Sequence, residues 1–284
     1  MGYQLWLSPN TGLRRKGTTF KELEALFIDQ ITTRYITEPL FSCRQYDDAN
    51  EVKAELIKRD FDYAGVIDEN NYIVGFCIRE ELNGGPIQQY IHSLNINTLI
   101  SDSTPLCKLF STLKESSFAF VLSWNQVSGI VTIWDINKPV VRIYLFGIIS
   151  LFELHINYWI DTFNAGGAWE SKIKADRLDE AKKMLRLKQG NNNELTLLEC
   201  LQLADKKEIL RNTPEFLEQF KFSKSKFKSI LESIEVMRNE IAHSQNSIIS
   251  NLKWPEFVDT VMFIETFLKN SETVLENQAI AAQN

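Results

Sequence analysis

Two residue types suited to chemistry on a phosphodiester stand close together near the end of a predicted helix. Arg238 carries a permanently charged, planar fork that matches phosphate oxygens, and His243 can give and take protons near neutral pH. Asn239 lies between them in the chain, where its amide could orient His243 or a phosphate oxygen. The chain has only three histidines, so His243 is not a by-product of histidine richness. These residues favour acid–base chemistry on a phosphodiester, which requires no metal.

The helix that must position these residues is predicted over residues 223–244. Arg238 and His243 differ by about 140° in direction, at about 100° per residue, so they do not meet readily within one helix. Asn239 and His243 lie four residues apart and stack. Two copies of the helix related by a twofold axis could bring the arginine and the histidine around one phosphate. The predicted buried face of this helix consists of Phe227, Ile230, Leu231, Ile234, Met237 and Ile241.

A structural alternative exists for the same residues. Arg238 can pair with an acid such as Glu235 or Glu153, and His243 can be a polar residue favoured by the dipole at the end of a helix. The upstream lysines, which could track phosphates beside the site or simply keep a helix start soluble, are Lys221, Lys224, Lys226 and Lys228. Glu240 falls off the arc shared by the polar residues, so we expect it to make a surface or helix-pairing contact.

The segment from Arg238 to His243, Arg-Asn-Glu-Ile-Ala-His, resembles the signature of the HEPN superfamily. The resemblance implies a helical domain, a homodimer and a metal-independent endoribonuclease that acts on RNA. It also implies roles for the residues. His243 would be the general acid or base, Arg238 would offset the charge that gathers on phosphorus, and Asn239 would orient His243 or a phosphate oxygen.

The N-terminal half contains an internal repeat. A predicted helix over residues 47–59 is followed by strands over 63–67 and 72–78, which are joined by a polar turn. The same order returns about fifty residues later, with a helix over 103–114 and strands over 118–122 and 127–132. A repeated helix–strand–turn–strand unit predicts two structurally equivalent modules.

The second module ends in the pattern Gly-x-x-Thr-x-x-Asp, with Gly129, Thr132 and Asp135. The repeat and this pattern resemble a tandem pair of CBS domains. That resemblance implies an adenosine-nucleotide ligand, with Thr132 at a phosphate and Asp135 at the ribose hydroxyls. In the first module Ile78 and Glu81 replace the threonine and the aspartate, so we expect that half to have lost a ligand site. The alternative is that Thr132 and Asp135 only cap the helix that follows.

Composition and cysteine usage narrow the class of protein. The chain has 284 residues, of which 44% are hydrophobic and 24% charged, as in soluble globular proteins with about two domains. The four cysteines are far apart and show no metal-ligand spacing, so we expect free thiols and no structural zinc. The start of the chain lacks the apolar core of a signal peptide, which favours a cytoplasmic protein. Charges interrupt the apolar stretch 140–160, so we expect a core or dimer-interface helix and no membrane span.

These observations predict an α+β chain: an N-terminal extension with a short helix (1–35), an α/β CBS pair (36–138) and an all-α, HEPN-like helical bundle (139–284). We expect helices over residues 139–163, 169–188, 195–210, 223–244 and 255–282. The leading hypothesis is an endoribonuclease that needs no cofactor for catalysis, is controlled by an adenine nucleotide through the first of these helices, and serves as a toxin or phage-defence effector. The alternatives are a non-catalytic, nucleotide-sensing dimerisation or scaffold protein, and an antitoxin-like or nucleotide-transfer partner.

Overall fold

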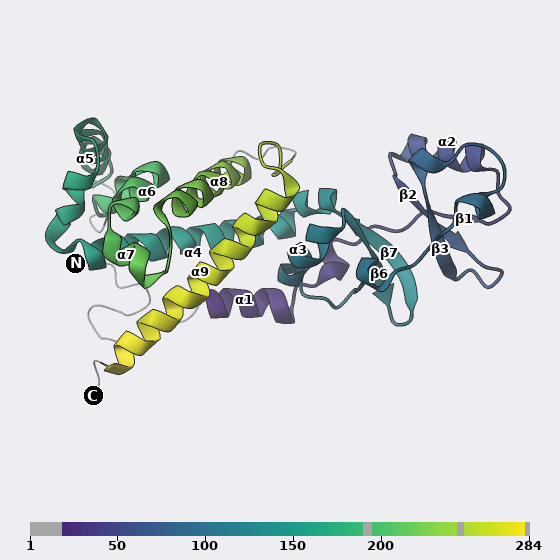
Figure 1. Cartoon of the computed structure of the whole chain (residues 1–284), viewed down its shortest axis with the longest axis horizontal. Coiled ribbons are helices and arrows are strands. Elements are labelled where there is room, and N and C mark those ends of the chain that lie inside the picture. Colours follow the sequence, from purple (N-terminus) through teal and green to yellow (C-terminus); the bar gives the residue numbers. More distant parts are fainter. Residues whose placement is uncertain (1–18, 190–194, 243–246, 282–284) are drawn as a thin grey trace. The chain divides into compact units, whose positions relative to one another are not determined.

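The computed structural model describes residues 19–189, 195–242 and 247–281, and the chain divides into two compact units. One unit comprises residues 27–141 and mixes strands with helices, whereas the other comprises residues 1–26 and 142–284, and its regular elements among the described residues are helices. Figure 1 labels the elements of both units. The boundaries expected from the sequence fell after residues 35 and 138, and those of the compact units fall after residues 26 and 141.

The α/β unit consists of two copies of one β-α-β-β module. In the first, β1 (Ser42–Arg44) precedes α2 (Ala49–Arg59), and β2 (Tyr63–Ile67) and β3 (Ile73–Ile78) follow; in the second, β5 (Leu99–Ser101) precedes α3 (Leu106–Glu115), and β6 (Phe118–Ser123) and β7 (Gln126–Thr132) follow. In both sheets the first strand is parallel to the second, and the second is antiparallel to the third. The predicted repeat is therefore confirmed. Each module also contains a three-residue strand that the sequence analysis missed.

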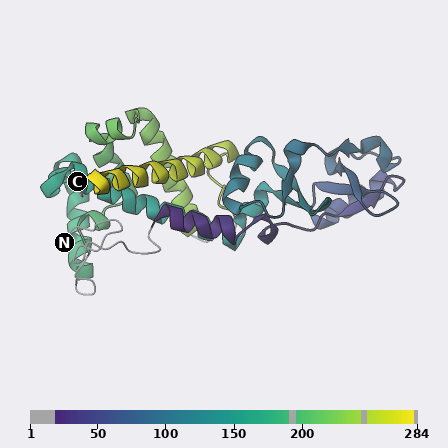
Figure 2. The same cartoon turned by 90° about the horizontal axis from the view of Figure 1, so that it is seen from below.

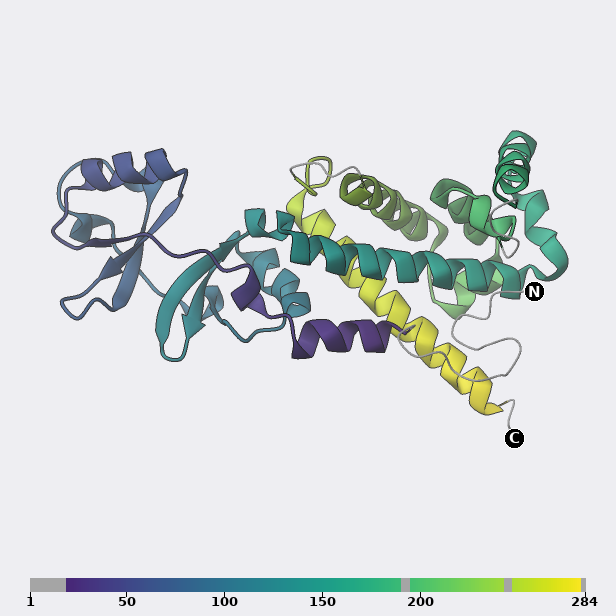
Figure 3. The same ribbon diagram turned by 180° about the vertical axis from the view of Figure 1, so that it is seen from behind.

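Local capping defines the first module's helix. The side chain of Asp48 accepts hydrogen bonds from the backbone N–H groups of Asn50 and Glu51, which starts α2, and Asp60 ends it in the left-handed conformation with φ 56°. The first sheet continues into β4 (His92–Ser93), which pairs with β3. On one face of this sheet α2 buries Val52 and Leu56. Figure 3 shows α2 lying over that sheet.

The two sheets also pack against each other through their remaining faces. Phe76 of β3 and Phe120 of β6 are buried there with ring centroids 4.9 Å apart, and Ile130 of β7 completes the buried group. At the margin the rings of Tyr63 and Phe118, which begin β2 and β6, approach to 4.2 Å. This apolar contact holds the equivalent strands of the two modules side by side.

A glycine at the same position of each module lets a further backbone segment come close. A Cβ on Gly129 would lie 2.5 Å from the carbonyl oxygen of Glu38, because Glu38 and Ile130 exchange two backbone hydrogen bonds of 2.9 Å. A Cβ on Gly75 would lie 2.7 Å from the carbonyl oxygen of His92. Gly129 therefore has a steric role that brings the segment at Glu38 beside the end of β7.

The helical unit contains α4 (Pro139–Phe163), α5 (Ala175–Gln189), α6 (Leu203–Arg211), α7 (Pro214–Gln219), α8 (Lys224–Ala242) and α9 (Trp254–Ala281). The predicted helix over 169–188 is wrong at its start, because short 3-10 turns from Ala165 to Lys172 precede α5 and Gly166 and Gly167 take positive φ there. The predicted helix over 195–210 is likewise interrupted before α6. The short helix α7 lies between two predicted helices and was not predicted; it begins at Pro214, because proline is well tolerated at a first helical position.

Helices α4 and α9 form the core of this unit. Tyr144, Phe152 and Trp159 of α4 are fully buried, and the ring of Phe152 meets that of Phe267 of α9 at 5.1 Å. In the same interface Ser271 of α9 lies 2.7 Å from Nδ1 of His155. By length and composition α4 could cross a membrane, and 44% of its most apolar window is buried inside the protein. Its packing on α9 fits the expectation of a core helix.

The N-terminal helix α1 (Phe20–Asp29), purple in Figure 2, starts in the helical unit, and its first residues contact α9. The carboxylate of Glu272 accepts a hydrogen bond from the backbone N–H of Phe20, and Lys269 pairs with Glu24 at 2.8 Å. The sequence had predicted this helix in a separate N-terminal extension. The structure instead shows that its first residues are bound to the C-terminal helix.

Candidate functional site

A cavity of about 540 Å³ opens in the α/β unit. Its walls are residues 38–41, which precede β1, residues 60–63, which join α2 to β2, Arg79 after β3, and Ile130, Thr132, Trp134 and Asp135 from the end of the second module. Both modules therefore contribute to it. Thr132 and Asp135, the two residues expected to bind a ligand, are both among its walls.

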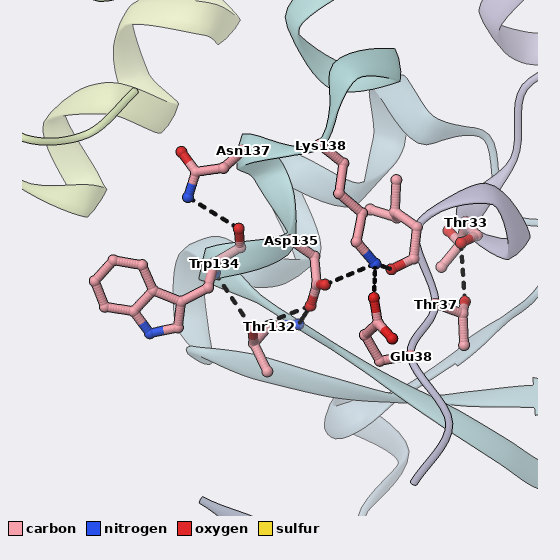
Figure 4. Close-up of polar contacts among 9 residues, drawn as sticks. Thr33, Thr37, Glu38, Thr132, Trp134, Asp135, Asn137 and Lys138 are labelled. Atoms are coloured by element: carbon pink, nitrogen blue, oxygen red, sulfur yellow. Dashed lines mark hydrogen bonds and ion pairs between the residues drawn. The ribbon is translucent and has the colours of Figure 1, made fainter. Parts of the chain in front are cut away.

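Thr132 and Asp135 also form a capping box. Oδ2 of Asp135 accepts hydrogen bonds from the backbone N–H of Thr132 at 2.7 Å and from its hydroxyl at 3.1 Å. Oγ1 of Thr132 in turn accepts from the backbone N–H of Trp134 at 3.2 Å (Figure 4). This arrangement starts the 3-10 helix Ile133–Asn137, so the predicted capping by these two residues is confirmed, whereas their expected binding of a ligand stays a prediction. The same two side chains thus cap a helix and line a cavity.

The other carboxylate oxygen of Asp135 is held by Lys138. Nζ of Lys138 lies 2.9 Å from Oδ1 of Asp135, and it also bonds the carboxylate of Glu38 and the carbonyl oxygen of Ile36 (Figure 4). Burial lowers the pKa of Lys138, but its hydrogen bonds to the two carboxylates outweigh burial and hold this pKa above its usual value. The ammonium therefore stays charged and ties the segment before β1 to the end of the second module.

Aromatic and charged groups from the first module complete the cavity. Nη2 of Arg79 lies 2.6 Å from Oδ1 of Asp62, and Nη1 lies 3.7 Å from Oδ1 of Asp60. Burial raises the pKa of Tyr63, whose hydroxyl therefore stays protonated at neutral pH. The Trp134 side chain is 61% exposed although Trp134 belongs to the cavity wall. Sequence reasoning missed these residues, and aligning Tyr63 with Phe118 across the repeat would have indicated that the start of β2 faces the second module.

The corresponding positions of the first module have other contacts. Oε2 of Glu81 lies 2.6 Å from Nε2 of His92, which is 42% exposed. Ile78 ends β3 and packs against the apolar contact between the two sheets. The prediction that the first module lost its ligand site stays a prediction.

In the helical unit Arg238 of α8 pairs with Glu153 of α4. The distance from Nε of Arg238 to Oε1 of Glu153 is 2.8 Å, which confirms the structural alternative for this arginine. The other carboxylate oxygen, Oε2, lies 3.7 Å from Nζ of Lys206 on α6, a lysine whose side chain is only 4% exposed. Burial lowers the pKa of Lys206, Glu153 opposes that effect, and Arg238 reinforces it. Two cations therefore surround one carboxylate.

The other motif positions have mixed outcomes. Asn239 is exposed on α8, and His243 lies outside the described residues. Of the two contacts expected for Glu240, the surface contact is wrong, because this residue is only 2% exposed. Its Oε1 instead accepts two 2.8 Å hydrogen bonds from the backbone N–H and the side-chain amide of Asn251. Glu240 thereby ties α8 to the segment that leads into α9. The lysines of the basic run (221, 224, 226 and 228) are all exposed at or just before the start of α8.

The cavity of the α/β unit and the face of α8 suit different ligands. The cavity offers carboxylate acceptors and aromatic surface, which suit hydroxyl and amine donors and a flat ring. The face of α8 offers an arginine that is 46% exposed and engaged through Nε, so its terminal amino groups can meet an anion. Within residues 19–189, 195–242 and 247–281, no group of three or more histidine, cysteine, aspartate or glutamate side chains could hold a metal ion.

No protein-family model and no curated protein matches the chain. Solved structures similar to it include CBS domains, with matches that span about 40% of the chain. One is a putative acetoin utilization protein from Vibrio cholerae (13% identity, TM-score 0.36, 40% of this chain and 92% of that chain). Another is a CBS domain pair in complex with 5′-methylthioadenosine and S-adenosyl-L-methionine (20%, 0.33, 37% and 91%). A third is the CBS domain of a bacterial CNNM/CorC family Mg²⁺ transporter in complex with ATP (16%, 0.33, 41% and 92%).

Proposed function

We propose that the α/β unit is a CBS pair that senses an adenosine-type ligand in the cavity beside Thr132 and Asp135. The single observation that carries this proposal is the cavity itself: about 540 Å³, lined by both modules and by Thr132 and Asp135 of the Gly-x-x-Thr-x-x-Asp pattern. Small-molecule sites typically measure roughly 300–1,000 Å³. The ring of Trp134 offers stacking surface for a base, and Asp135 offers an acceptor for ribose hydroxyls.

Two tryptophans of the α/β unit provide a matched test of this proposal. Trp134 lines the cavity, whereas Trp124 is 98% exposed in the turn between β6 and β7 and is not part of the cavity wall. Stacking of a base on an aromatic ring contributes about 1–3 kcal/mol. Titration calorimetry of the full chain with adenosine derivatives should therefore show Trp134→Ala weakening binding by about tenfold or more. Trp124→Ala should bind like the wild type. Equal affinities for the two variants, or no binding to the wild type, would contradict the proposal.

We propose a second function for the helical unit: a dimeric, HEPN-type endoribonuclease that needs no metal. The supporting observation is the geometry of Arg238, which is exposed on α8 and fixed through Nε by Glu153. The terminal amino groups of Arg238 bind a phosphate of RNA, and Asn239 orients His243 or a phosphate oxygen. His243 of either subunit transfers protons. The exposed lysines at the start of α8 would track the RNA backbone.

The test is cleavage of RNA by the purified full chain in the presence of a metal chelator. We expect Arg238→Ala and His243→Ala to abolish cleavage and Asn239→Ala to reduce it less. Lys183→Ala, which changes an exposed cation of α5, should retain most of the activity. If the wild type cuts no RNA with or without adenosine derivatives, the chain is instead a non-catalytic ligand sensor or scaffold.

Only a few residues of the chain separate the cavity of the α/β unit from the first long helix of the helical unit. Lys138 bonds Asp135 in the cavity wall, and α4 begins at the next residue, Pro139. We propose that ligand binding at Asp135 favours one arrangement of two nuclease subunits over another, which would suit a toxin or phage-defence effector. A cleavage rate that stays constant while a ligand saturates the cavity would contradict this coupling.

A further inference from the structure

Carboxylates outnumber cations around the cavity of the α/β unit. Its described walls carry four acids, Glu38, Asp60, Asp62 and Asp135, and one base, Arg79. Two further cations lie beside the wall: Lys138 bonds two of these carboxylates, and Arg59 lies over the ring of Phe41 but pairs with Glu55. Even with Lys138 included, two negative charges remain in excess.

Arg79 and Lys138 are both already bound to acids of the same cavity. Arg79 contacts Asp62 at 2.6 Å and Asp60 at 3.7 Å through its two terminal nitrogens. Lys138 uses its ammonium on Asp135, on Glu38 and on the carbonyl oxygen of Ile36. A phosphate group would have to share either cation with a carboxylate that is already bound to it.

The hydrogen-bond donors at the end of β7 are engaged as well. The backbone N–H and the hydroxyl of Thr132 both donate to Oδ2 of Asp135, and the backbone N–H of Trp134 donates to Oγ1 of Thr132. These are the groups that a phosphate at Thr132 would need as donors. The capping box therefore removes the phosphate contact that the sequence resemblance implied for Thr132.

The remaining chemistry suits a ligand that donates hydrogen bonds or carries positive charge. Ribose hydroxyls and an exocyclic amine can donate to carboxylates, which only accept. The aromatic side chains Phe61, Tyr63 and Trp134 can hold a flat base, and an aromatic face also attracts a cation.

We propose that the ligand of this cavity is an adenosine derivative without phosphate groups, either uncharged or cationic. This inference rests on the proposed ligand-sensing function and narrows its ligand. An AMP or ATP molecule would bring two or more negative charges into a site whose own excess is negative. Like charges a few ångströms apart near a protein surface repel by more than about 1 kcal/mol, so discrimination of about tenfold or more is expected.

The experiment is titration calorimetry of the full chain with adenosine, 5′-methylthioadenosine, S-adenosylmethionine, AMP and ATP, without divalent cations. A double variant, Asp60→Asn with Asp62→Asn, removes the two acids that hold Arg79. Asparagine also tolerates the left-handed backbone at position 60. The matched control is Glu51→Gln with Glu69→Gln, which changes the net charge equally at exposed positions outside the cavity wall.

We expect the three phosphate-free compounds to bind about tenfold or more tightly than AMP and ATP. The Asp60/Asp62 double variant should bring AMP and ATP closer to adenosine in affinity, because Arg79 becomes available to a phosphate, while the control variant keeps the wild-type order. If AMP or ATP binds more tightly than adenosine, the inference is overturned and the ligand-sensing function stands. If no compound binds, the ligand-sensing function falls and the inference falls with it.

Discussion

The capping box at Asp135 provides a prediction whose magnitude follows from its contacts. Asp135 is only 8% exposed, and its carboxylate accepts two hydrogen bonds from Thr132 and pairs with Lys138. Loss of a helix-capping side chain costs about 0.5–2 kcal/mol, and a hydrogen bond to a charged group contributes about 1.5–3 kcal/mol. Because Lys138 keeps Glu38 as a partner, the contributions do not add in full.

We therefore expect Asp135→Ala to lower the free energy of unfolding of the α/β unit by about 2–4 kcal/mol. Asp135→Asn keeps the shape and one acceptor oxygen but places an amide beside the ammonium of Lys138, so it should cost about 1–2 kcal/mol. Glu69→Ala, at an exposed position of the same unit, should stay within about 0.5 kcal/mol of the wild type.

The assay is native-state hydrogen exchange of the full chain, read by mass spectrometry on peptides from β6 and β7. This measurement reports the opening of one unit without assuming that both units unfold together. Exchange in these strands should be faster in Asp135→Ala than in Asp135→Asn, and unchanged in Glu69→Ala. Equal protection in all three variants would refute the reasoning, since it would mean that the carboxylate of Asp135 stabilises nothing.

Three further predictions concern other contacts. Glu153→Gln should slow RNA cleavage by roughly tenfold or more, because the charge that fixes Arg238 is lost. Glu232→Gln, which removes a carboxylate of α8 that pairs with Lys207, should leave the cleavage rate unchanged. Equal rates in both variants would contradict this role of Glu153. Burial lowers the pKa of His155 from 6.5 to about 3, so the neutral ring stabilises the fold above pH 6.5, and acidification to pH 4 should cost about 3 kcal/mol in urea unfolding. A His155→Gln variant with the same pH dependence would exclude His155 as the cause. Gly129→Ala should lower the free energy of unfolding by about 1–3 kcal/mol, measured by denaturation, because its Cβ would clash with the carbonyl of residue 38, and unchanged stability would contradict the close approach.

Periodic and repeated patterns in the sequence predicted much of the architecture. The double module, the strands at β2, β3, β6 and β7, and the long helix α4 follow from apolar patterning over many residues. The strands β1 and β5 escaped prediction because three residues are too few to show a period, and their pairing with β2 and β6 depends on contacts distant in sequence. The helix α7 was missed because a proline can end one helix or begin another, and the residues around Pro214 do not decide between the two.

The candidate sites were predicted in part. The Gly-x-x-Thr-x-x-Asp pattern led to Thr132 and Asp135, and the structure adds that they bind each other, which sequence spacing alone left open. Asp60 and Asp62 of the first module were not predicted as site residues, because no local motif marks them. They line the cavity only because the two modules pack together. The pairing of Arg238 with Glu153 was one of two open possibilities, and the approach of α8 to α4 decides between them.

The most direct test of the central claim is a hydrogen-exchange footprint of 5′-methylthioadenosine on the full chain. Ligand binding in the cavity should slow exchange in three segments that are distant in sequence, residues 38–41, 60–63 and 130–135, because together they line the cavity. Unchanged exchange in all three segments at saturating ligand, or protection confined to the helical unit, would contradict this claim.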